Sequence, residues 1–94
     1  MRKFGKTDSN QTEIVCGLKK LGISVFSIAS LGNGHPDIVV GHKGKNFLFE
    51  IKNGNKPPSQ RKLTDMEIIY FETWGGQVNI AMNLDEVLKV IGLV

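Results

Sequence analysis

Two short alternating segments that flank a Lys-Gly pair constrain this chain more than any other feature. Residues 36–41 and 45–52 alternate with the period of two that is typical of β-strands, and Lys43-Gly44 between them fits a tight turn. One face of the resulting hairpin is wholly apolar and should belong to the core: Ile38, Val40, Phe47, Phe49 and Ile51. The sequence therefore predicts an antiparallel hairpin with one buried face.

The opposite face of this hairpin gathers charge at one end. A hairpin centred between Lys43 and Gly44 pairs Asp37 with Glu50, and Lys52 lies on the same face as both. Two facing carboxylates repel each other, whereas a divalent cation would reverse that cost. The lysine could then orient a water or stabilise charge on a phosphate. A three-residue loop would instead separate the carboxylates, and a plain solvated strand edge is the simpler alternative.

The rest of the chain alternates helical and extended segments within a single domain, residues 1–94. Thr64 and Glu67 have the spacing of a capping box at the start of a helix. The expected elements outside the hairpin are a helix that begins at Asp8 or Ser9, a strand at 23–29, a helical region in two pieces from Ser59 to Trp74, a strand at 77–82 and a helix at 84–91. The order α-β-β-β-α-β-α predicts an α/β fold with a mixed sheet flanked by helices.

The composition favours a soluble domain with an anionic partner. Hydrophobic residues make up 40% of the chain, charged residues 22%, and the net charge is +3. An excess of Lys and Arg fits phosphate binding, although alone it is weak support. No apolar run is long enough to cross a bilayer, and the basic segment 1–6 lacks the apolar stretch of a signal peptide. We expect a cytoplasmic protein without a membrane partner, in which Cys16 is a buried apolar residue.

The charged hairpin also resembles a known nuclease motif. Pro36-Asp37, followed after the turn by Glu50-Ile51-Lys52, resembles the PD-(D/E)xK pattern. The chain from Gly34 through the loop at 53–59 and the helix that ends at Trp74 is similar to the virus-type replication-repair nuclease family (VRR-NUC). The likeness continues through the strand near Val78 to Ala81 and the last helix, so it covers nearly the whole chain. The stand-alone members of that family come largely from bacteriophages. The resemblance implies a restriction-endonuclease-like core and a Mg²⁺- or Mn²⁺-dependent endonuclease that hydrolyses DNA phosphodiester bonds.

The resemblance implies roles for individual residues. Asp37 and Glu50 match the metal-binding acids, and Lys52 matches the catalytic lysine. The remaining matches are the backbone carbonyl of Ile51 as a further metal ligand, Glu13 as an acid that reaches the metal directly or through water, and Gln60 as a polar residue that helps arrange the site. Glu13 can equally be a solvated helix residue, and Gln60 an ordinary residue of a first helical turn.

The implied partner is branched DNA, such as a four-way (Holliday) junction, cut by a homodimer with paired active sites. The best candidates for phosphate contacts follow the catalytic strand: Lys56, Arg61 and Lys62. Weaker candidates lie in the basic N-terminal segment: Arg2, Lys3 and Lys6. His35 has no counterpart in the family pattern, and a turn residue is its simplest interpretation. A flap or nicking nuclease, a non-catalytic nucleic-acid-binding module and a small partner-binding protein remain as alternatives.

Overall fold

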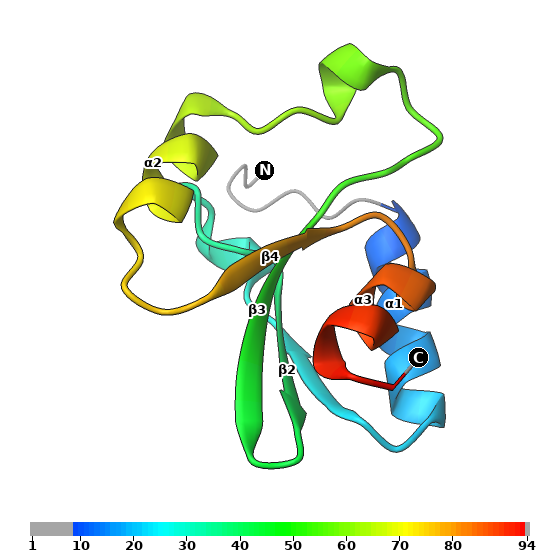
Figure 1. The fold of residues 1–94 in the computed structure, drawn as a ribbon. Coiled ribbons are helices and arrows are strands. Elements are labelled where there is room, and N and C mark those ends of the chain that lie inside the picture. Colours follow the sequence, from blue (N-terminus) through cyan, green and yellow to red (C-terminus); the bar gives the residue numbers. More distant parts are fainter. Residues whose placement is uncertain (1–8, 94) are drawn as a thin grey trace.

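A four-stranded sheet forms the centre of the computed structural model, which describes residues 9–93 (Figure 1). In chain order, the elements are α1 (Ser9–Lys20), β1 (Ser24–Ser27), the 3-10 helix η1 (Ala29–Leu31), β2 (Ile38–His42), β3 (Lys45–Ile51), the 3-10 helix η2 (Pro58–Gln60), α2 (Asp65–Thr73), β4 (Val78–Ala81) and α3 (Leu84–Ile91). The strands lie in the order β1-β2-β3-β4, with antiparallel pairs except for the parallel pair β3-β4. Helices α1 and α3 lie on one side of the sheet and α2 on the other (Figure 1).

This architecture confirms the prediction of a mixed sheet flanked by helices. The element order differs from the predicted one because of two 3-10 helices, η1 and η2. Helix η1 begins at Ala29, the residue at which the first strand was predicted to end. Helix η2 is a short 3-10 helix in the place where the first piece of the helical region was predicted. None of the helices within residues 9–93 is long and apolar enough to cross a membrane.

The hairpin of β2 and β3 has the predicted register. Val39 pairs with Leu48, and Gly41 pairs with Asn46. Lys43 and Gly44 form a two-residue loop in which both have positive φ angles, 52° and 79°. Two consecutive positive φ angles are typical of the hairpin turn whose twist matches that of the strands. The two-residue loop therefore keeps the two carboxylates on one face.

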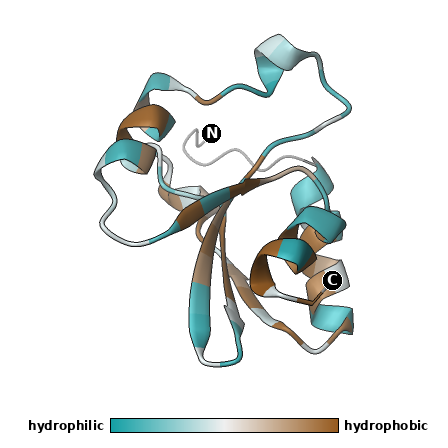
Figure 2. Cartoon of the chain, in the orientation of Figure 1, coloured by the Kyte–Doolittle hydropathy of each residue, from teal (hydrophilic) through white to brown (hydrophobic). Residues whose placement is uncertain are grey.

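The core lies between one face of the sheet and the helices α1 and α3. Figure 2 shows hydrophobic residues along the strands and on both of these helices. The buried residues of this cluster are Ile14 and Leu18 of α1, Ile38 and Val40 of β2, Phe49 and Ile51 of β3, Ile23, Ala81, and Val87, Leu88 and Ile91 of α3. Phe47 packs against the cluster and is partly buried. The predicted apolar face of the hairpin is thus confirmed as core.

The orientation of helix α1 contradicts the prediction for Cys16. Ile14 and Leu18, four positions apart, face the sheet, and Cys16 lies between them in sequence on the other side of the helix. Cys16 is exposed, so the expectation of a buried cysteine is wrong. Asp8, one of the two residues expected to begin this helix, lies outside the described residues.

Helix α2 begins at the predicted capping box but has no buried residue. The Thr64 side chain accepts a hydrogen bond from the backbone N–H of Glu67, and the Glu67 carboxylate accepts one from the backbone N–H of Thr64. The loop before β2 packs closely on this helix. A Cβ atom added to Gly34, which has a φ of +80°, would lie 2.6 Å from the carbonyl oxygen of Met66. Only glycine allows this approach without strain.

Candidate functional site

Hydrogen bonds of both its backbone and its side chain fix Asp37 at the open end of the hairpin. Its backbone N–H donates to the carbonyl of Phe49 (2.8 Å), and its own carbonyl accepts from the N–H of Ile28 (2.8 Å). Its carboxylate Oδ2 accepts a hydrogen bond from the backbone N–H of Ile51 at 2.7 Å. The side chain therefore lies across the end of β3, on the side of Glu50.

Glu50 lies on the same face of the sheet and is almost completely buried, with 4% of its surface exposed. Its Oε1 atom has no hydrogen-bond partner among the described residues. Burial raises the pKa of this carboxyl to about 9, and the nearby carboxylates of Glu67 and Asp37 contribute to the increase. A buried acid with an unpartnered oxygen is costly for folding, so its presence calls for a functional explanation.

Lys52 lies between two carboxylates. Its Nζ donates a hydrogen bond to Oε1 of Glu67 at 2.8 Å and lies 3.5 Å from Oε2 of Glu50. Burial by itself lowers the pKa of this lysine, but the hydrogen bond to Glu67 and the charge of Glu50 outweigh that effect, so its pKa is raised. At neutral pH the lysine is therefore a positively charged ammonium group and cannot act as a general base.

Glu67 is a member of this cluster that the sequence did not identify as a site residue. Its Oε1 accepts hydrogen bonds from Lys52 Nζ and from the backbone N–H of Thr64. Burial tends to raise its pKa, but the contacts with Glu50, Lys52 and Thr64 lower it on balance. One carboxylate thus joins the start of α2 to the lysine at the end of β3. The capping-box spacing was the available signal, and it predicted only the helix start.

A cavity of about 300 Å³ opens beside these four side chains. Gln60 lines it from the end of η2, and His35 lines it from the loop before β2. Ile51 also lines the cavity. Because its side chain is buried in the core on the other face of the sheet, Ile51 contributes backbone atoms here. The structure therefore brings together Asp37, Glu50, Ile51, Lys52 and Gln60.

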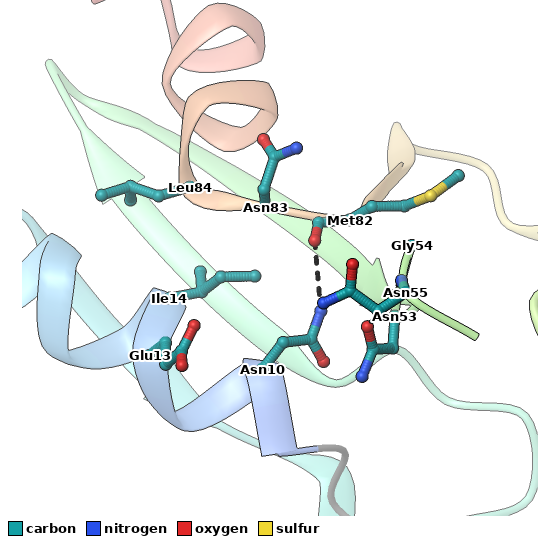
Figure 3. Close-up of a pocket in the computed structure, with 9 residues that line it drawn as sticks. All are labelled: Asn10, Glu13, Ile14, Asn53, Gly54, Asn55, Met82, Asn83 and Leu84. Carbon is teal, nitrogen blue, oxygen red and sulfur yellow. Dashed lines mark hydrogen bonds between the residues drawn. The ribbon is translucent and has the colours of Figure 1, made fainter.

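Glu13 does not join this group. It is exposed on α1 and lines a second cavity, of about 400 Å³, together with Asn10, Asn53 and other residues (Figure 3). The side-chain amide of Asn10, in this second cavity, donates hydrogen bonds to the carbonyls of Lys52 (2.9 Å) and Met82 (3.2 Å). In this structure Glu13 belongs to a different surface from the two paired carboxylates.

The predicted phosphate contacts lie on the long loop that leaves β3. Lys56 and Lys62 are exposed, and Arg61 donates a hydrogen bond from its Nε to the carbonyl of Lys56 at 2.8 Å. Because Gln60 lines the first cavity, the basic residues that follow it are next to that cavity in the chain. The other candidates, Arg2, Lys3 and Lys6, lie outside the described residues.

The residues present fit a weakly held magnesium or manganese ion. Within residues 9–93, no group of three or more His, Cys, Asp or Glu residues is arranged to hold a metal. Mg²⁺ needs fewer, since one or two carboxylates usually suffice when water and a substrate phosphate complete its oxygen ligands. Asp37, the unpartnered oxygen of Glu50 and the backbone of Ile51 supply such a partial oxygen set.

Comparison of the chain with models of protein families, with curated proteins and with solved structures finds no match. The function must therefore be inferred from the chemistry of the site.

Proposed function

We propose that this protein is a Mg²⁺- or Mn²⁺-dependent deoxyribonuclease of the VRR-NUC type, with a restriction-endonuclease-like core. The observation that carries the proposal is the meeting of Asp37, Glu50 and Lys52 at one cavity, at the end of a hairpin whose other face is core. The buried acid Glu50 would be a liability in a protein that binds no cation. A bound cation would turn the same carboxyl into a ligand.

Each residue of the site would have a separate role in the proposed reaction. Asp37, Glu50 and the Ile51 carbonyl would hold the cation, which when bound neutralises the scissile phosphate and favours ionisation of a water molecule. Lys52 carries a positive charge into the cavity, where it would stabilise the charge that develops on the phosphate. Glu67 fixes the direction of the lysine side chain through the 2.8 Å hydrogen bond. The protein thereby places charges in advance of the reaction.

A homodimer that acts on branched DNA in the cytoplasm is the fuller form of this proposal. The face of the sheet that carries Glu50 also carries apolar side chains that are only partly covered. Phe26 of β1 is 59% exposed and Ile80 of β4 is 42% exposed, and register places both on this face with Val39 and Leu48. A second copy could cover these side chains and supply the second active site that symmetric cutting of a junction needs.

Cleavage of a panel of labelled DNAs tests the proposal. The protein is incubated with four-way junction, flap, nicked, single-stranded and duplex DNA in the presence of Mg²⁺, Mn²⁺ or EDTA. We expect metal-dependent cutting that falls by at least roughly 10²-fold in Asp37→Asn and in Lys52→Met, because each removes charge at the reacting phosphate. Lys45→Met and Asp85→Asn change exposed residues of the same types and should cut normally.

The pattern of results separates the alternatives. Preference for the junction would support a resolvase. Preference for flaps or nicks would support the same metal-dependent cleavage but with flap or nicked DNA as the substrate. If no DNA is cut and a junction binds equally well with Mg²⁺ or EDTA, the non-catalytic binding module replaces the nuclease.

A further inference from the structure

Three aromatic rings form a row that starts at the cavity and follows α2. His35 lines the cavity, and its ring meets the edge of Tyr70 with centroids 5.4 Å apart and planes at 72°. Tyr70 in turn stacks on Trp74, with centroids 5.2 Å apart and planes at 17°. The row consists of His35, Tyr70 and Trp74, and we call it the aromatic row.

The backbone around the aromatic row holds the rings in place. Tyr70 and Trp74 are four positions apart, so their side chains lie on the same side of α2. His35 reaches them because Gly34 packs directly on the backbone of Met66, an approach that a larger residue would block. At the far end, a Cβ atom on Gly76 would lie 3.1 Å from the indole Nε1 of Trp74. Two glycines therefore allow close packing at the two ends of the row.

The row presents aromatic surface to solvent. Trp74 is 47% exposed, although one face of its indole is covered by Tyr70. The exposed area therefore lies on the parts of the indole that Tyr70 does not cover. His35 is also exposed, at the opposite end and beside the cavity. Large aromatic side chains that are held rigidly and half-exposed are a common means of binding flat ligands.

We propose that the aromatic row stacks unpaired bases of a single-stranded DNA segment next to the phosphate that is cut. This inference rests on the proposed nuclease function. Every base has a π-face, so a stacking platform tolerates any sequence. Gln60 also lines the cavity, and Arg61 and the exposed Lys62 follow it in the chain. Rings suited to bases and basic side chains suited to the phosphate backbone are therefore both attached to residues of this cavity.

Fluorescence of the unaltered protein provides the direct test, because Trp74 is the only tryptophan in the chain. The protein is titrated in EDTA, where no cutting is expected, with single-stranded oligothymidylate, with a blunt duplex of equal length and with an abasic deoxyribose-phosphate oligomer. We expect oligothymidylate to quench the emission strongly, and the duplex and the abasic oligomer to leave it nearly unchanged. Equal quenching by the abasic oligomer would overturn the proposal, since charge alone would then explain binding.

Variants test the same idea through binding of an end-labelled oligothymidylate, followed by fluorescence anisotropy. Trp74→Leu should weaken binding about tenfold, which is within the usual effect of losing one stacked base. Trp74→Phe retains a ring and should recover most of the affinity. Leu21→Ala removes an exposed apolar side chain directly after α1, on the other side of the sheet from α2, and should bind as the unaltered protein does.

A second copy of the chain is the competing occupant of the row. If Trp74→Leu leaves oligothymidylate binding unchanged but shifts the protein from dimer to monomer in sedimentation, the row is a contact between copies and the stacking proposal is wrong. Failure of the two proposals can be told apart. Quenching without cleavage of any DNA would remove the nuclease and leave base stacking, whereas cleavage without quenching would remove only the stacking.

Discussion

The two faces of the sheet differ in what covers them. On one face, Ile38, Val40 and Phe49 are completely buried beneath α1 and α3. The other face carries Asp37 and Glu50 at one end and half-exposed apolar side chains elsewhere, and α2 lies only over its charged end (Figure 1). The covered face therefore supplies stability. The open face holds buried charge at a cost, which is what a site arranged for a cation and a phosphate would require.

The largest expected effect on stability comes from a substitution in the covered face. Phe49→Ala removes a fully buried ring and should lower the free energy of unfolding by about 3–5 kcal/mol, measured by urea denaturation. Leu48→Ala, its neighbour on the open face, should cost about 1 kcal/mol because that side chain is only partly buried.

The same pair of variants can show that the two faces do not differ in how far they are covered. If Leu48→Ala costs as much as Phe49→Ala, and the cost grows with protein concentration, the open face is covered by a second copy in solution. The two faces would then both contribute to stability, and the homodimer would be supported.

The second largest effect concerns the contact that positions α2 over the open face. Gly34→Ala forces a side chain into a positive φ and against the backbone of Met66, so we expect a loss of about 2–4 kcal/mol of unfolding free energy. Gly44→Ala is the matched control. Its φ is also positive, at +79°, but nothing lies within 4 Å, so only the backbone strain of about 1 kcal/mol remains. Equal losses would mean that the loop does not need its close approach to α2.

The sequence predicted those parts of the molecule that depend on local geometry. A two-residue turn set the hairpin register, and so the sharing of one face by Asp37 and Glu50. Helix α3 spans Leu84–Ile91 as predicted, because its helical spacing is a local feature, and Asn83 caps it.

What the sequence did not predict depends on how distant elements pack. Glu67 reaches Lys52 across fifteen positions in the chain, and no local pattern fixes where α2 lies relative to the hairpin. For the same reason Glu13 and Cys16 had no predictable surroundings. The rotation of α1 about its axis is set by Ile14 and Leu18 against the sheet, which leaves Glu13 beside a different cavity.

A smaller effect concerns Glu50 and pH. Its pKa is raised to about 9 in the folded protein from the ordinary value of 4.5, so between these limits the folded state holds a proton that the unfolded state has lost. Stability should therefore fall as pH rises from about 5 to about 9 in EDTA, and the full cost is present above pH 9. Glu50→Gln should remove this slope and raise the free energy of unfolding at pH 8.

Thermal denaturation across this pH range measures the effect, with Glu72→Gln, an exposed residue of α2, as the control. Mg²⁺ should stabilise the unaltered protein, by about 1.4 kcal/mol for each tenfold excess over its dissociation constant, and should not stabilise Glu50→Gln. Equal stabilisation of both would show that the cation binds elsewhere.

The smallest expected effect tests whether α2 contributes to the chemistry of the open face or only covers it. Glu67→Gln keeps the shape of the side chain and an oxygen that can accept from Thr64, but it removes the negative charge next to Lys52. The lysine pKa should then fall, because the ion pair with Glu67 is a main cause of its increase. Unfolding free energy should change by about 1 kcal/mol or less, since the helix cap survives.

The cleavage rate of Glu67→Gln should fall several-fold. Its pH profile should shift to lower pH on the alkaline side, where loss of the lysine proton ends activity. Glu72→Gln on the same helix should leave the profile unchanged. If Glu67 has only a structural role, the stability should change while the pH profile of cleavage stays the same. The two measurements together therefore decide whether α2 contributes to the chemistry at the open face or only covers it.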